Sequence, residues 1–405
     1  MKIAIIGMGP AGTGVVSTLR RHDSDAEITM FSAENVPPYS PPALGDYLIT
    51  GNKEGLFRHE DDFFKTYNVK QRPGEKIVQV MPEEKQLKTQ NNEIFDFDHL
   101  VIASGSSLYA PVKGADKKGI YNFKTLDGAD QIKRISQEDK TAVVLGGGFI
   151  GVEIALCLAK IGIKPTLLNR RGWIMPRLLD VETAGYVEKD LRAQGVEVLL
   201  NTEGKEFVGN ESVDGLLTSN GKTLTADIYI AATGVKPNID FIKDTDIEYD
   251  QGIVVDEKLR TRYPYIYACG DVAQTIDLLS GKRKIHGLYP VAMDHAQTAA
   301  CNILGMEREY ERPININSLK ELGFKIIVVG NQKAEEVFEY KTENILRKIY
   351  ITADKIVGFV LLGDISNAGI YLSLLKKKTN VAKFKHRLLS KGFSPGFLPG
   401  MVGVN

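Results

Sequence analysis

The feature that most constrains the fold is a glycine pattern near the start of the chain, at residues 7–12. A short apolar run, residues 3–6, precedes it and is typical of a buried parallel strand. Val15, Val16 and Leu19 follow at helical spacing. A strand, the pattern Gly-x-Gly-x-x-Gly and a helix in this order predict a turn that binds the pyrophosphate of a dinucleotide.

The residues of this turn have separate predicted roles. Gly7 is expected to make the tight turn, Gly9 to let the backbone approach a pyrophosphate, and Gly12 to let the helix pack closely on the strand. Pro10 and Ala11 open the helix, whose first N–H groups face the anion. A glycine turn without a ligand is the alternative for a single pattern of this kind, so a second signal is required.

An acidic residue that binds a ribose is expected about 20 residues after such a turn. The apolar-rich segment 28–31 indicates the second strand, and Glu34 lies just past its end. Prolines then exclude a helix until about Pro42. This stretch is either a rigid surface loop or a preformed wall against a flat ligand, and the turn after it could bring Lys53 to the same place.

The same order of strand, glycine turn and helix occurs again from residue 142. The apolar strand 142–145 leads into a second Gly-x-Gly-x-x-Gly, and an amphipathic helix follows. The next strand, 165–168, ends where an acidic residue would hold a ribose, but Asn169 stands there. The residues expected to contact a second dinucleotide are Gly146, Gly148, Phe149, Ile150, Gly151, Asn169, Arg170 and Arg171.

Each glycine turn is matched by a later apolar strand that ends in small residues. Residues 100–103 and 227–232 both run into Ala-Ser/Thr-Gly, where a backbone can approach a ligand closely. This internal repeat implies two separate dinucleotides, which must differ because a second copy of the same one would be redundant. The small residues concerned are Ala103, Ser104, Gly105, Thr233 and Gly234.

Gly270 and Asp271 follow shortly after a third apolar strand, residues 266–268. The aspartate can accept hydrogen bonds from the hydroxyl groups of a polyol chain, although a plain helix cap is the alternative. Tyr289 precedes the predicted helix 291–304, whose N-terminus could face a ligand with partial positive charge.

Composition excludes several function classes. The chain has 51 basic and 51 acidic residues and no basic stripe, which disfavours nucleic acid or an anionic membrane as the main partner. No apolar run reaches the roughly 18 residues that span a bilayer. The three cysteines, Cys157, Cys269 and Cys301, lie far apart, so neither a disulfide framework nor a metal site is expected. A reducing cytoplasm fits best.

The predicted fold class is α/β, with two nested Rossmann-like dinucleotide-binding domains and a small C-terminal α+β domain. The first dinucleotide-binding domain is discontinuous, comprising residues 1–109 and 236–312, and encloses the second, residues 110–235. The α+β domain is expected over 313–383. The last segment, 384–405, is rich in Gly, Pro and Phe and is expected to be either a disordered tail or a docking segment.

The motifs resemble the two-Rossmann flavoprotein reductases of the pyridine nucleotide–disulfide oxidoreductase class. The likeness is greatest to the NADH:rubredoxin and ferredoxin reductase-like branch, and it covers roughly residues 1–365. Besides the two glycine patterns, the motifs that carry it are Pro37-Pro38-Tyr39-Ser40, Ala103-Ser104-Gly105, Ala232-Thr233-Gly234-Val235-x-Pro237-Asn238, Tyr267-Ala268-Cys269-Gly270-Asp271 and Tyr289-Pro290.

This resemblance implies FAD in the first domain and NAD(P)H in the second. It assigns the adenosine ribose of FAD to Glu34, the ribityl and phosphate region to Asp271, and the pyrimidine edge of the flavin to the backbone near Tyr289 and Ala292. Ile77 is also expected to contact the cofactor. The first glycine turn and residues 103–105 would approach the FAD pyrophosphate, and the second glycine turn would bind the nicotinamide dinucleotide.

In this class a glutamate, here Glu153, lies near the nicotinamide and is often paired with a lysine, for which Lys53 is the candidate. The redox cysteine of the disulfide reductases is missing from the segment 39–48, which disfavours thiol–disulfide chemistry. Tyr289 stands where tryptophan is common, and His295 where glutamine is frequent.

The activity implied is hydride transfer from the nicotinamide to flavin N5, followed by release of electrons to a one-electron carrier. That carrier would be a small protein of the rubredoxin or ferredoxin type, or an iron–sulfur subunit of a larger complex docked through residues 384–405. The alternatives are an NADH oxidase that produces peroxide and a non-enzymatic, redox-sensing flavoprotein. NADH is expected as the main donor, with measurable use of NADPH, because Asn169 carries no charge to repel a 2′-phosphate and Arg170 and Arg171 could bind one.

Overall fold

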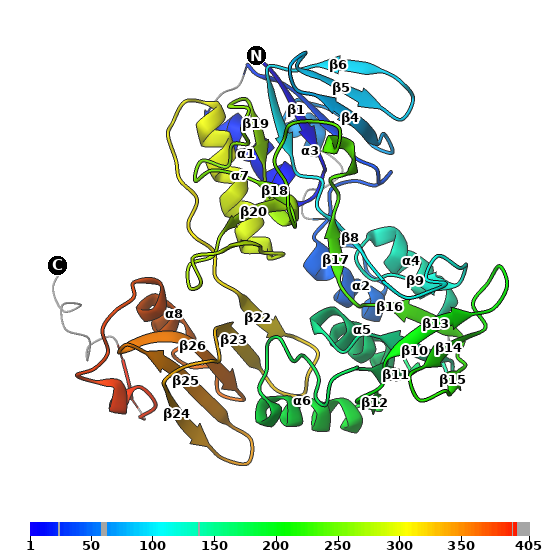
Figure 1. The fold of residues 1–405 in the computed structure, drawn as a ribbon, viewed down its shortest axis with the longest axis vertical. Helices are drawn as coiled ribbons and strands as arrows, with labels where there is room; N and C mark the ends of the chain where they lie inside the picture. The colour runs from blue at the N-terminus through cyan, green and yellow to red at the C-terminus, as the bar shows by residue number, and fades with distance from the viewer. Residues whose placement is uncertain (23–24, 58–62, 137, 391, 395–405) are drawn as a thin grey trace. The chain divides into compact units, whose positions relative to one another are not determined.

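The structure is a computed structural model that describes residues 1–22, 25–57, 63–136, 138–390 and 392–394. Its contacts divide the chain into two compact units. Unit 1 comprises Met1–Tyr109, Lys124–Lys133 and Gly234–Pro313, and unit 2 comprises Ala110–Phe123, Arg134–Thr233 and Ile314–Asn405. Each unit is built around its own parallel sheet (Figure 1).

Unit 1 contains a five-stranded parallel sheet in the order β19-β7-β1-β2-β3. The central strand β1 (Lys2–Ile6) has four buried apolar residues in succession, as expected for a strand covered on both faces. Its neighbours are β2 (Glu27–Phe31), β3 (Val69–Arg72), β7 (His99–Ile102) and β19 (Ile266–Ala268).

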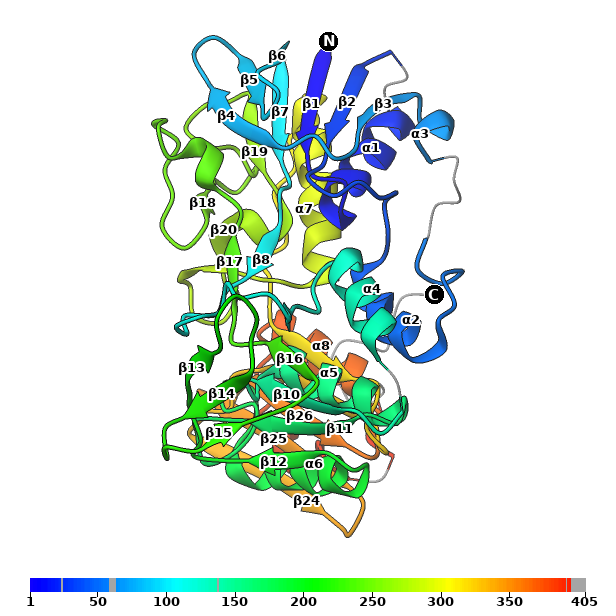
Figure 2. The same ribbon diagram turned by 90° about the vertical axis from the view of Figure 1, so that its right-hand side faces the viewer.

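Two helices, α1 (Pro10–His22) and α7 (Tyr289–Ile303), pack against each other beside this sheet (Figures 1 and 2). Their close approach depends on Gly14, where a Cβ atom would lie 2.7 Å from the Cβ of Ala296. A three-stranded antiparallel meander consists of β4 (Ile77–Met81), β5 (Gln86–Thr89) and β6 (Ile94–Asp96). It contributes to the same hydrophobic core as the helices and the parallel sheet.

The remaining elements of unit 1 are short. The proline-rich stretch, where the sequence excludes a helix until about Pro42, ends in a 3₁₀ turn, Pro41–Ala43, and a short helix, α2 (Leu44–Thr50). The others are α3 (Phe63–Thr66), β8 (Ser106–Leu108), β17 (Val235–Pro237), the 3₁₀ turns Asp240–Ile242 and Gly270–Val272, β18 (Ile253–Val254), β20 (Ala273–Ile276) and β21 (Arg283–Ile285).

Unit 2 repeats the parallel sheet of unit 1 with the strand order β12-β11-β10-β16-β9. In both sheets the strand before the glycine turn is central and the next two strands lie on one side of it. The elements are β9 (Ile120–Tyr121), β10 (Thr141–Leu145), α5 (Phe149–Lys160), β11 (Lys164–Leu168), α6 (Val181–Ala193), β12 (Glu197–Leu199) and β16 (Ile228–Ala231).

An antiparallel sheet of three strands packs on the parallel sheet of unit 2, as the meander does in unit 1. Phe207 and Leu216 from this small sheet are fully buried and join Val143 and Tyr229 of the parallel sheet in one core cluster. The strands are β13 (Gly204–Val208), β14 (Gly215–Thr218) and β15 (Thr223–Leu224). The two predicted dinucleotide-binding folds are thus confirmed as repeats of one architecture.

The C-terminal α+β module lies within unit 2. Its five-stranded antiparallel sheet has the order β22-β23-β26-β25-β24, and helix α8 (Ala368–Lys376) packs on β26. Lys348, which is 6% exposed, forms ion pairs at 2.8 Å with Asp180 and 2.6 Å with Glu182 at the start of α6. The strands are β22 (Ile316–Leu319), β23 (Ile326–Gly330), β24 (Glu336–Lys341), β25 (Leu346–Thr352) and β26 (Lys355–Leu362).

The first part of the predicted tail packs on this module. Phe393 is 3% exposed and stacks on Tyr371 with ring centroids 6.0 Å apart. The Tyr371 hydroxyl donates to the carbonyl oxygen of Leu388, which is fully buried. A solvated tail is therefore excluded for 384–390 and 392–394, while the rest of the predicted docking segment, residue 391 and residues 395–405, lies outside the described residues.

The two units differ from the expected domain boundaries mainly in one internal segment, besides shifts of one or two residues at 234–235 and 313. Residues 124–133, expected in the second dinucleotide-binding domain, belong to unit 1 and include most of α4 (Leu126–Ile135). Side-chain contacts explain this, because Tyr47 hydrogen-bonds to Asp130 and Lys133 donates to the carbonyl oxygen of Leu48 at 2.9 Å. Sequence alone does not indicate this contact, since contacts distant along the chain leave no local pattern.

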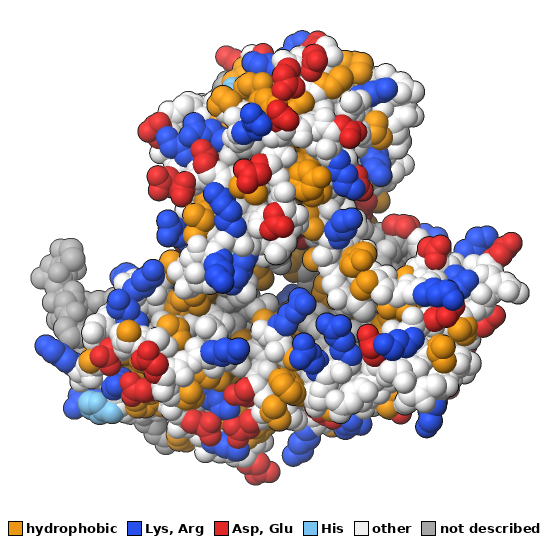
Figure 3. Space-filling view, in the orientation of Figure 1, with side chains coloured by type: hydrophobic (Ala, Val, Ile, Leu, Met, Phe, Trp, Pro, Cys, Tyr) orange, Lys and Arg blue, Asp and Glu red, His pale blue; other side chains and the backbone are white. Residues whose placement is uncertain are grey.

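Within the described residues, no helix is long and apolar enough to cross a membrane. Basic and acidic side chains both occur across the face shown in Figure 3, in keeping with their equal numbers in the sequence.

Candidate functional site

The glycine turn of unit 1 lies at the carboxyl end of β1. Gly7 has φ +111°, and a Cβ atom there would lie 2.1 Å from the carbonyl oxygen of Ala103. A Cβ atom on Gly12 would lie 2.0 Å from the carbonyl oxygen of Gly7. A Cβ atom on Gly9, by contrast, would meet no atom within 4 Å. The turn is therefore open at Gly9, whereas Gly7 and Gly12 on either side of it are in close contact with backbone carbonyl groups.

A second turn adjoins the N-terminus of α1. Gly270 has φ +73°, and a Cβ atom on it would lie 3.1 Å from the Cβ of Ala11 and 3.7 Å from that of Ala292. The structure thus brings α1, the turn at Gly270 and the first turn of α7 together. Pro10 and Tyr289 are the first residues of these two helices, and Tyr289 is half-buried. The positive ends of two helix dipoles consequently lie near one turn.

Asp271, in the same turn, has two polar partners. Its Oδ2 accepts a hydrogen bond from the Ser106 hydroxyl at 2.9 Å and forms an ion pair with Lys124 Nζ at 3.1 Å. About a quarter of each charged side chain is exposed. The pair therefore holds a cation beside the carboxylate at the position expected for the ribityl and phosphate region.

The small-residue end of β7 is fixed by Asn238. Its side-chain amide donates to the carbonyl oxygen of Ser104 at 2.9 Å, and its backbone N–H donates to that of Gly105 at 3.0 Å. Ser104 in turn donates its hydroxyl to the Asn238 carbonyl at 2.7 Å. Gly105 has φ +65° and no atom within 4 Å of a Cβ position, so one side of this loop is also open.

Glu34 lies three residues past the end of β2 and is half-buried. The Tyr39 hydroxyl donates to its carboxylate, at 3.1 Å to Oε2, and accepts from the backbone N–H of Leu126 at 3.1 Å. Burial raises the pKa of Glu34, and the hydrogen bond from Tyr39 opposes this rise. The proline-rich loop thus ties the predicted ribose ligand to the first residue of α4.

Lys53 has a different carboxylate partner from the one expected. Its Nζ lies 3.6 Å from Asp130 Oδ2 and 5.4 Å from the centre of the Tyr47 ring, and its side chain is 49% exposed. Glu153 is a half-buried residue of α5 in unit 2. A pairing of Lys53 with Glu153 would join the two units and stays a prediction.

Ile77, the other expected contact, is 3% exposed on β4 and belongs to the hydrophobic core of unit 1. Its side chain is accounted for by packing among apolar residues.

The glycine turn of unit 2 repeats that of unit 1. Gly146 has φ +118°, and a Cβ atom there would lie 2.4 Å from the carbonyl oxygen of Ala232. A Cβ atom on Gly151 would lie 1.8 Å from the carbonyl oxygen of Gly146, whereas one on Gly148 would meet nothing within 4 Å. Gly148 caps α5, and Phe149 and Ile150, both half-buried, form its first turn.

Asn169 lies directly after β11 but is directed into its own loop. It is 6% exposed, and its amide nitrogen donates to the carbonyl oxygens of Trp173 at 2.5 Å and Arg171 at 3.3 Å. The side chains of Arg170 and Arg171 are exposed. The donors of Asn169 are therefore used locally, which the sequence did not indicate.

Thr233 and Gly234 follow β16 at the end of the sheet. Thr233 is exposed and ends the second segment of unit 2, and Gly234 begins the next segment of unit 1 with φ +156° and no atom within 4 Å of a Cβ position. The residues after β16 are thus arranged like those after β7, with small side chains at the carboxyl edge of the sheet.

Comparison with known proteins decides the family. The model of the family described as "Pyridine nucleotide-disulphide oxidoreductase" matches residues 1–299, and that described as "Rubredoxin NAD+ reductase C-terminal domain" matches residues 316–379. The chain belongs to the pyridine nucleotide-disulphide oxidoreductase family. Membership implies FAD and NAD(P)H as cofactors.

Relatives within this family differ in length. A nitrite reductase [NAD(P)H] of Bacillus subtilis is 28% identical over 94% of this chain, but the chain spans only 48% of that protein. An NADH-rubredoxin oxidoreductase of Clostridium acetobutylicum is 29% identical over 90% of this chain and 92% of its own length. The reductase in a covalent putidaredoxin reductase–putidaredoxin complex has the same fold, with a TM-score of 0.87 at 22% identity over 94% of both chains.

Within this oxidoreductase family the described residues fit an FAD in unit 1. The open side of Gly9, the N-termini of α1 and α7, and the paired charges of Asp271 and Lys124 would meet its phosphates and hydroxyls. Glu34 would meet the adenosine ribose. No sequence motif singles out Lys124 or Ser106, and the motif that contains Tyr39 does not indicate that its hydroxyl bonds to Glu34.

The cysteines differ from those of a dithiol enzyme. Within the described residues all three are thiols. Cys157 and Cys269 are fully buried, and burial raises the pKa of the Cys269 thiol far above its usual range. A buried, protonated thiol is a poor nucleophile.

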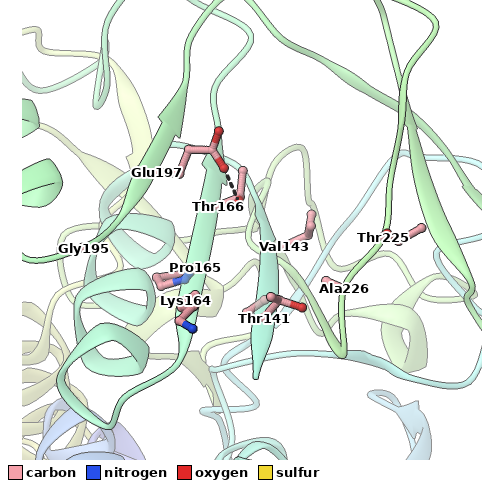
Figure 4. A pocket seen from close by; sticks show the side chains of 10 residues that line it. Thr141, Val143, Lys164, Pro165, Thr166, Gly195, Glu197, Thr225 and Ala226 are labelled. Carbon is pink, nitrogen blue, oxygen red and sulfur yellow. Dashed lines mark hydrogen bonds between the residues drawn. The ribbon is translucent and has the colours of Figure 1, made fainter. Parts of the chain in front are cut away.

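A cavity of about 210 Å³ lies at the amino ends of β10 and β11, in unit 2 (Figure 4). Lys164, Thr166 and Glu197 are among its lining residues, and Thr166 donates to Glu197 at 2.8 Å. Ligands of open parallel sheets bind at the carboxyl ends of the strands. This cavity is therefore separate from the predicted dinucleotide site.

Proposed function

We propose that this chain is an FAD-dependent reductase that takes electrons from NADH and passes them to a small one-electron carrier protein. The observation that carries this proposal is the doubled glycine turn, with one copy in each unit and matching backbone geometry. Two such turns are needed only where two dinucleotides bind. Bound FAD would supply the chemistry that accepts an electron pair and releases single electrons.

Separate groups of residues in unit 1 would each bind a different part of FAD. Amides at the start of α1 would bind its pyrophosphate next to Gly7, Gly9 and Gly12. Glu34, oriented by Tyr39, would accept hydrogen bonds from the adenosine ribose. Asp271 and Lys124 would hold the ribityl and phosphate region, and the first turn of α7 would face the flavin.

The residues of unit 2 would hold the nicotinamide dinucleotide at Gly146, Gly148 and Gly151. NADH as the main donor is supported by the NADH-named relatives of this length. Because Asn169 adds no negative charge and the exposed Arg170 and Arg171 are near, NADPH would be used to a measurable degree. Glu153 would lie near the nicotinamide.

The carrier would be of the rubredoxin or ferredoxin type, as the names of similar proteins suggest. Thiol–disulfide exchange is a poorer candidate for the acceptor reaction, because Cys157 and Cys269 are buried. The similarity to half of a nitrite reductase supports a related form, in which the chain hands electrons to an iron–sulfur subunit or domain of a larger oxidoreductase.

The test is an anaerobic titration of the FAD-loaded protein with NADH and, separately, NADPH, followed at the flavin absorbance. We expect NADH to bleach the flavin and added rubredoxin or ferredoxin to restore it. A flavin that neither nucleotide bleaches would remove the reductase proposal and favour a redox-sensing protein. Fast, steady oxygen consumption without a carrier would instead indicate an oxidase.

Purification from the native source separates the two forms of the proposal. A single free flavoprotein in the size profile is expected for the stand-alone reductase. Co-elution with iron–sulfur subunits would assign the chain to a larger complex.

A further inference from the structure

The loop between β11 and α6, residues 169–180, contacts the glycine turn of unit 2 at two places. The backbone N–H of Met175 donates to the carbonyl oxygen of Gly147 at 2.7 Å. A Cβ atom on Gly147 would lie 2.7 Å from the Cβ of Asn169, so the first residue of the loop also lies against the turn. The loop therefore helps to fix the backbone that is expected to receive the nicotinamide dinucleotide.

Met175 has an unfavourable backbone conformation at this contact. Its φ is +50°, in a region that residues with a Cβ atom seldom adopt. Its side chain is buried, and its carbonyl oxygen accepts from the backbone N–H groups of Leu178 at 2.8 Å and Leu179 at 2.9 Å. Such a conformation persists only where the surrounding structure enforces it. Contacts that hold residues 178–180 consequently also hold Met175 against the turn.

Three side chains of the C-terminal module hold the end of this loop. The side-chain amide of Gln332 donates to the carbonyl oxygen of Leu178. Lys348 Nζ lies 2.8 Å from Asp180 Oδ2, and the Tyr350 hydroxyl donates to the same oxygen at 3.1 Å. All of these residues belong to unit 2. A series of direct contacts thus leads from the C-terminal module through the loop to the glycine turn.

Lys348 is the central group of this anchor. Its buried ammonium group also lies 2.6 Å from the carboxylate of Glu182 and 3.5 Å from that of Glu339. Asp180 uses its other oxygen to accept from the backbone N–H of Thr183, and so caps α6. Removing the ammonium group would leave neighbouring carboxylates without their cation. The end of the loop therefore depends on a residue of β25, which is 168 positions away from Asp180 in the chain.

We propose that the C-terminal module positions the nicotinamide dinucleotide site, with Lys348 and Gln332 as positioning residues that act through the loop 169–180. This inference rests on the proposed function of unit 2. Neither side chain would touch the dinucleotide. The loop also carries the exposed Arg170 and Arg171, so the same anchor sets where their guanidinium groups stand at the end of β11. Loss of the anchor is expected to weaken NADH binding, and NADPH binding further, while FAD stays bound in unit 1.

The experiment compares amide hydrogen exchange and nucleotide use in two variants of the full-length, FAD-loaded protein. Lys348→Met removes the cation, and Gln332→Glu replaces the donor to Leu178 with a carboxylate of the same shape. We expect amides of residues 175–180 to exchange about tenfold faster in both variants, and the KM for NADH to rise about tenfold. The KM for NADPH is expected to rise further, whereas kcat and FAD content stay at the wild-type values. Calorimetric titration with NAD⁺ measures the binding loss without turnover.

Glu321→Gln is the matched control. Glu321 of the C-terminal module pairs with Lys160, the last residue of α5, at the end of that helix opposite to the glycine turn. The variant removes a contact between the same module and the rest of unit 2, but at a place away from the loop. It is expected to leave the exchange of residues 175–180 and the KM for NADH unchanged.

A wild-type KM for NADH in Gln332→Glu would overturn the proposal, even if the melting temperature falls, because the anchor would then be merely structural. An equal rise of KM in Glu321→Gln would also overturn it, since the effect would not pass through the loop. If Lys348→Met fails to fold, Gln332→Glu decides, because Gln332 is only half-buried. A wild-type protein that binds neither NADH nor NAD⁺ would instead refute the proposed function of unit 2, while hydrogen exchange still tests whether the module anchors the loop.

Discussion

The two glycine turns share one backbone geometry but differ in what stands beside them. Gly7 and Gly146 have φ +111° and +118°, and both donate their N–H to the last residue of the neighbouring strand, at 2.7 Å and 3.0 Å. Gly9 and Gly148 both face open space. The backbone of a pyrophosphate site has therefore been repeated almost unchanged.

The difference lies at the end of the second strand. In unit 1, Glu34 is three residues past β2 and is held by Tyr39, which also binds the start of α4. In unit 2, Asn169 is one residue past β11, and its amide is bonded within its own loop. The shared turn is suited to any dinucleotide. Which dinucleotide each unit binds therefore depends on these strand-end side chains and their surroundings.

A second difference is the element that covers each turn. In unit 1 the turn at Gly270 and helix α7 lie next to α1, which brings Asp271 and Lys124 to the site. In unit 2 the loop after Asn169 covers that place, with the N–H of Met175 donating to the carbonyl oxygen of Gly147 at 2.7 Å. In unit 1 the neighbouring element thus contributes a pair of charged side chains, whereas in unit 2 it contributes a backbone hydrogen bond to the turn itself.

The largest effects are expected from paired alanine substitutions at the two open glycines. A Cβ atom on Gly9 or Gly148 meets nothing in the protein, so neither change should alter the melting temperature of the apoprotein. Each Cβ would enter the space needed by a pyrophosphate and displace it. A displacement that costs about 3 kcal/mol of binding free energy lowers the affinity roughly a hundredfold. Gly9→Ala should weaken FAD binding, and Gly148→Ala should raise the KM for NADH with full FAD content.

Fluorescence titration of FAD and steady-state kinetics measure these two effects. Gly12→Ala is the contrasting variant, since its Cβ would lie 2.0 Å from the carbonyl oxygen of Gly7 and should destabilise the apoprotein itself. If Gly148→Ala empties the FAD site as well, the assignment of one dinucleotide to each unit fails.

An intermediate effect is expected from Glu34→Gln. The carboxylate that accepts from ribose hydroxyls is lost while the hydrogen bond from Tyr39 can be kept, so FAD affinity should fall about tenfold at neutral pH. Because burial raises the pKa of Glu34, wild-type affinity should also fall as the pH is lowered through that raised pKa, and the variant should lack this dependence.

The stability of the apoprotein is expected to change with pH in the opposite direction to the FAD affinity. A carboxyl with a raised folded-state pKa binds more protons in the native state than in the unfolded state. The contribution of Glu34 to the free energy of unfolding therefore declines as the pH rises from the ordinary glutamate range through the raised pKa. Glu34→Gln should accordingly raise the apoprotein melting temperature at neutral pH, and a lowered value would contradict the role of burial at this residue.

An effect no larger than that on FAD affinity at Glu34 is expected at the matching position of unit 2. Asn169→Glu adds a negative charge at the end of β11 and should lower the ratio of kcat/KM for NADPH over NADH by about tenfold. Asn169→Gln is the control, because it disturbs the loop bonds to Arg171 and Trp173 without adding charge. An equal ratio in wild type and Asn169→Glu would show that Asn169 does not face the ribose phosphate.

The sequence by itself determined the two parallel sheets, the glycine turns and the small-residue strand ends. These features are readable because strand, turn and helix are contiguous, and because only glycine tolerates φ near +111° with a carbonyl oxygen 2.1 Å from a Cβ position. The α+β class of the C-terminal module was also predicted, although its exposed edge strand β24 has no apolar alternation that leads to a buried face.

Only the tertiary structure decided which distant residues meet at each site. Lys124 reaches Asp271 across 147 positions of the chain, Tyr39 links Glu34 to Leu126, and His295 supports Gly270 from another element. Such contacts leave no periodicity, since a hydrogen bond constrains two atoms and not the residues around them. Contacts of the same kind, between residues distant along the chain, also join residues 124–133 to unit 1 and pair Lys53 with the carboxylate of Asp130.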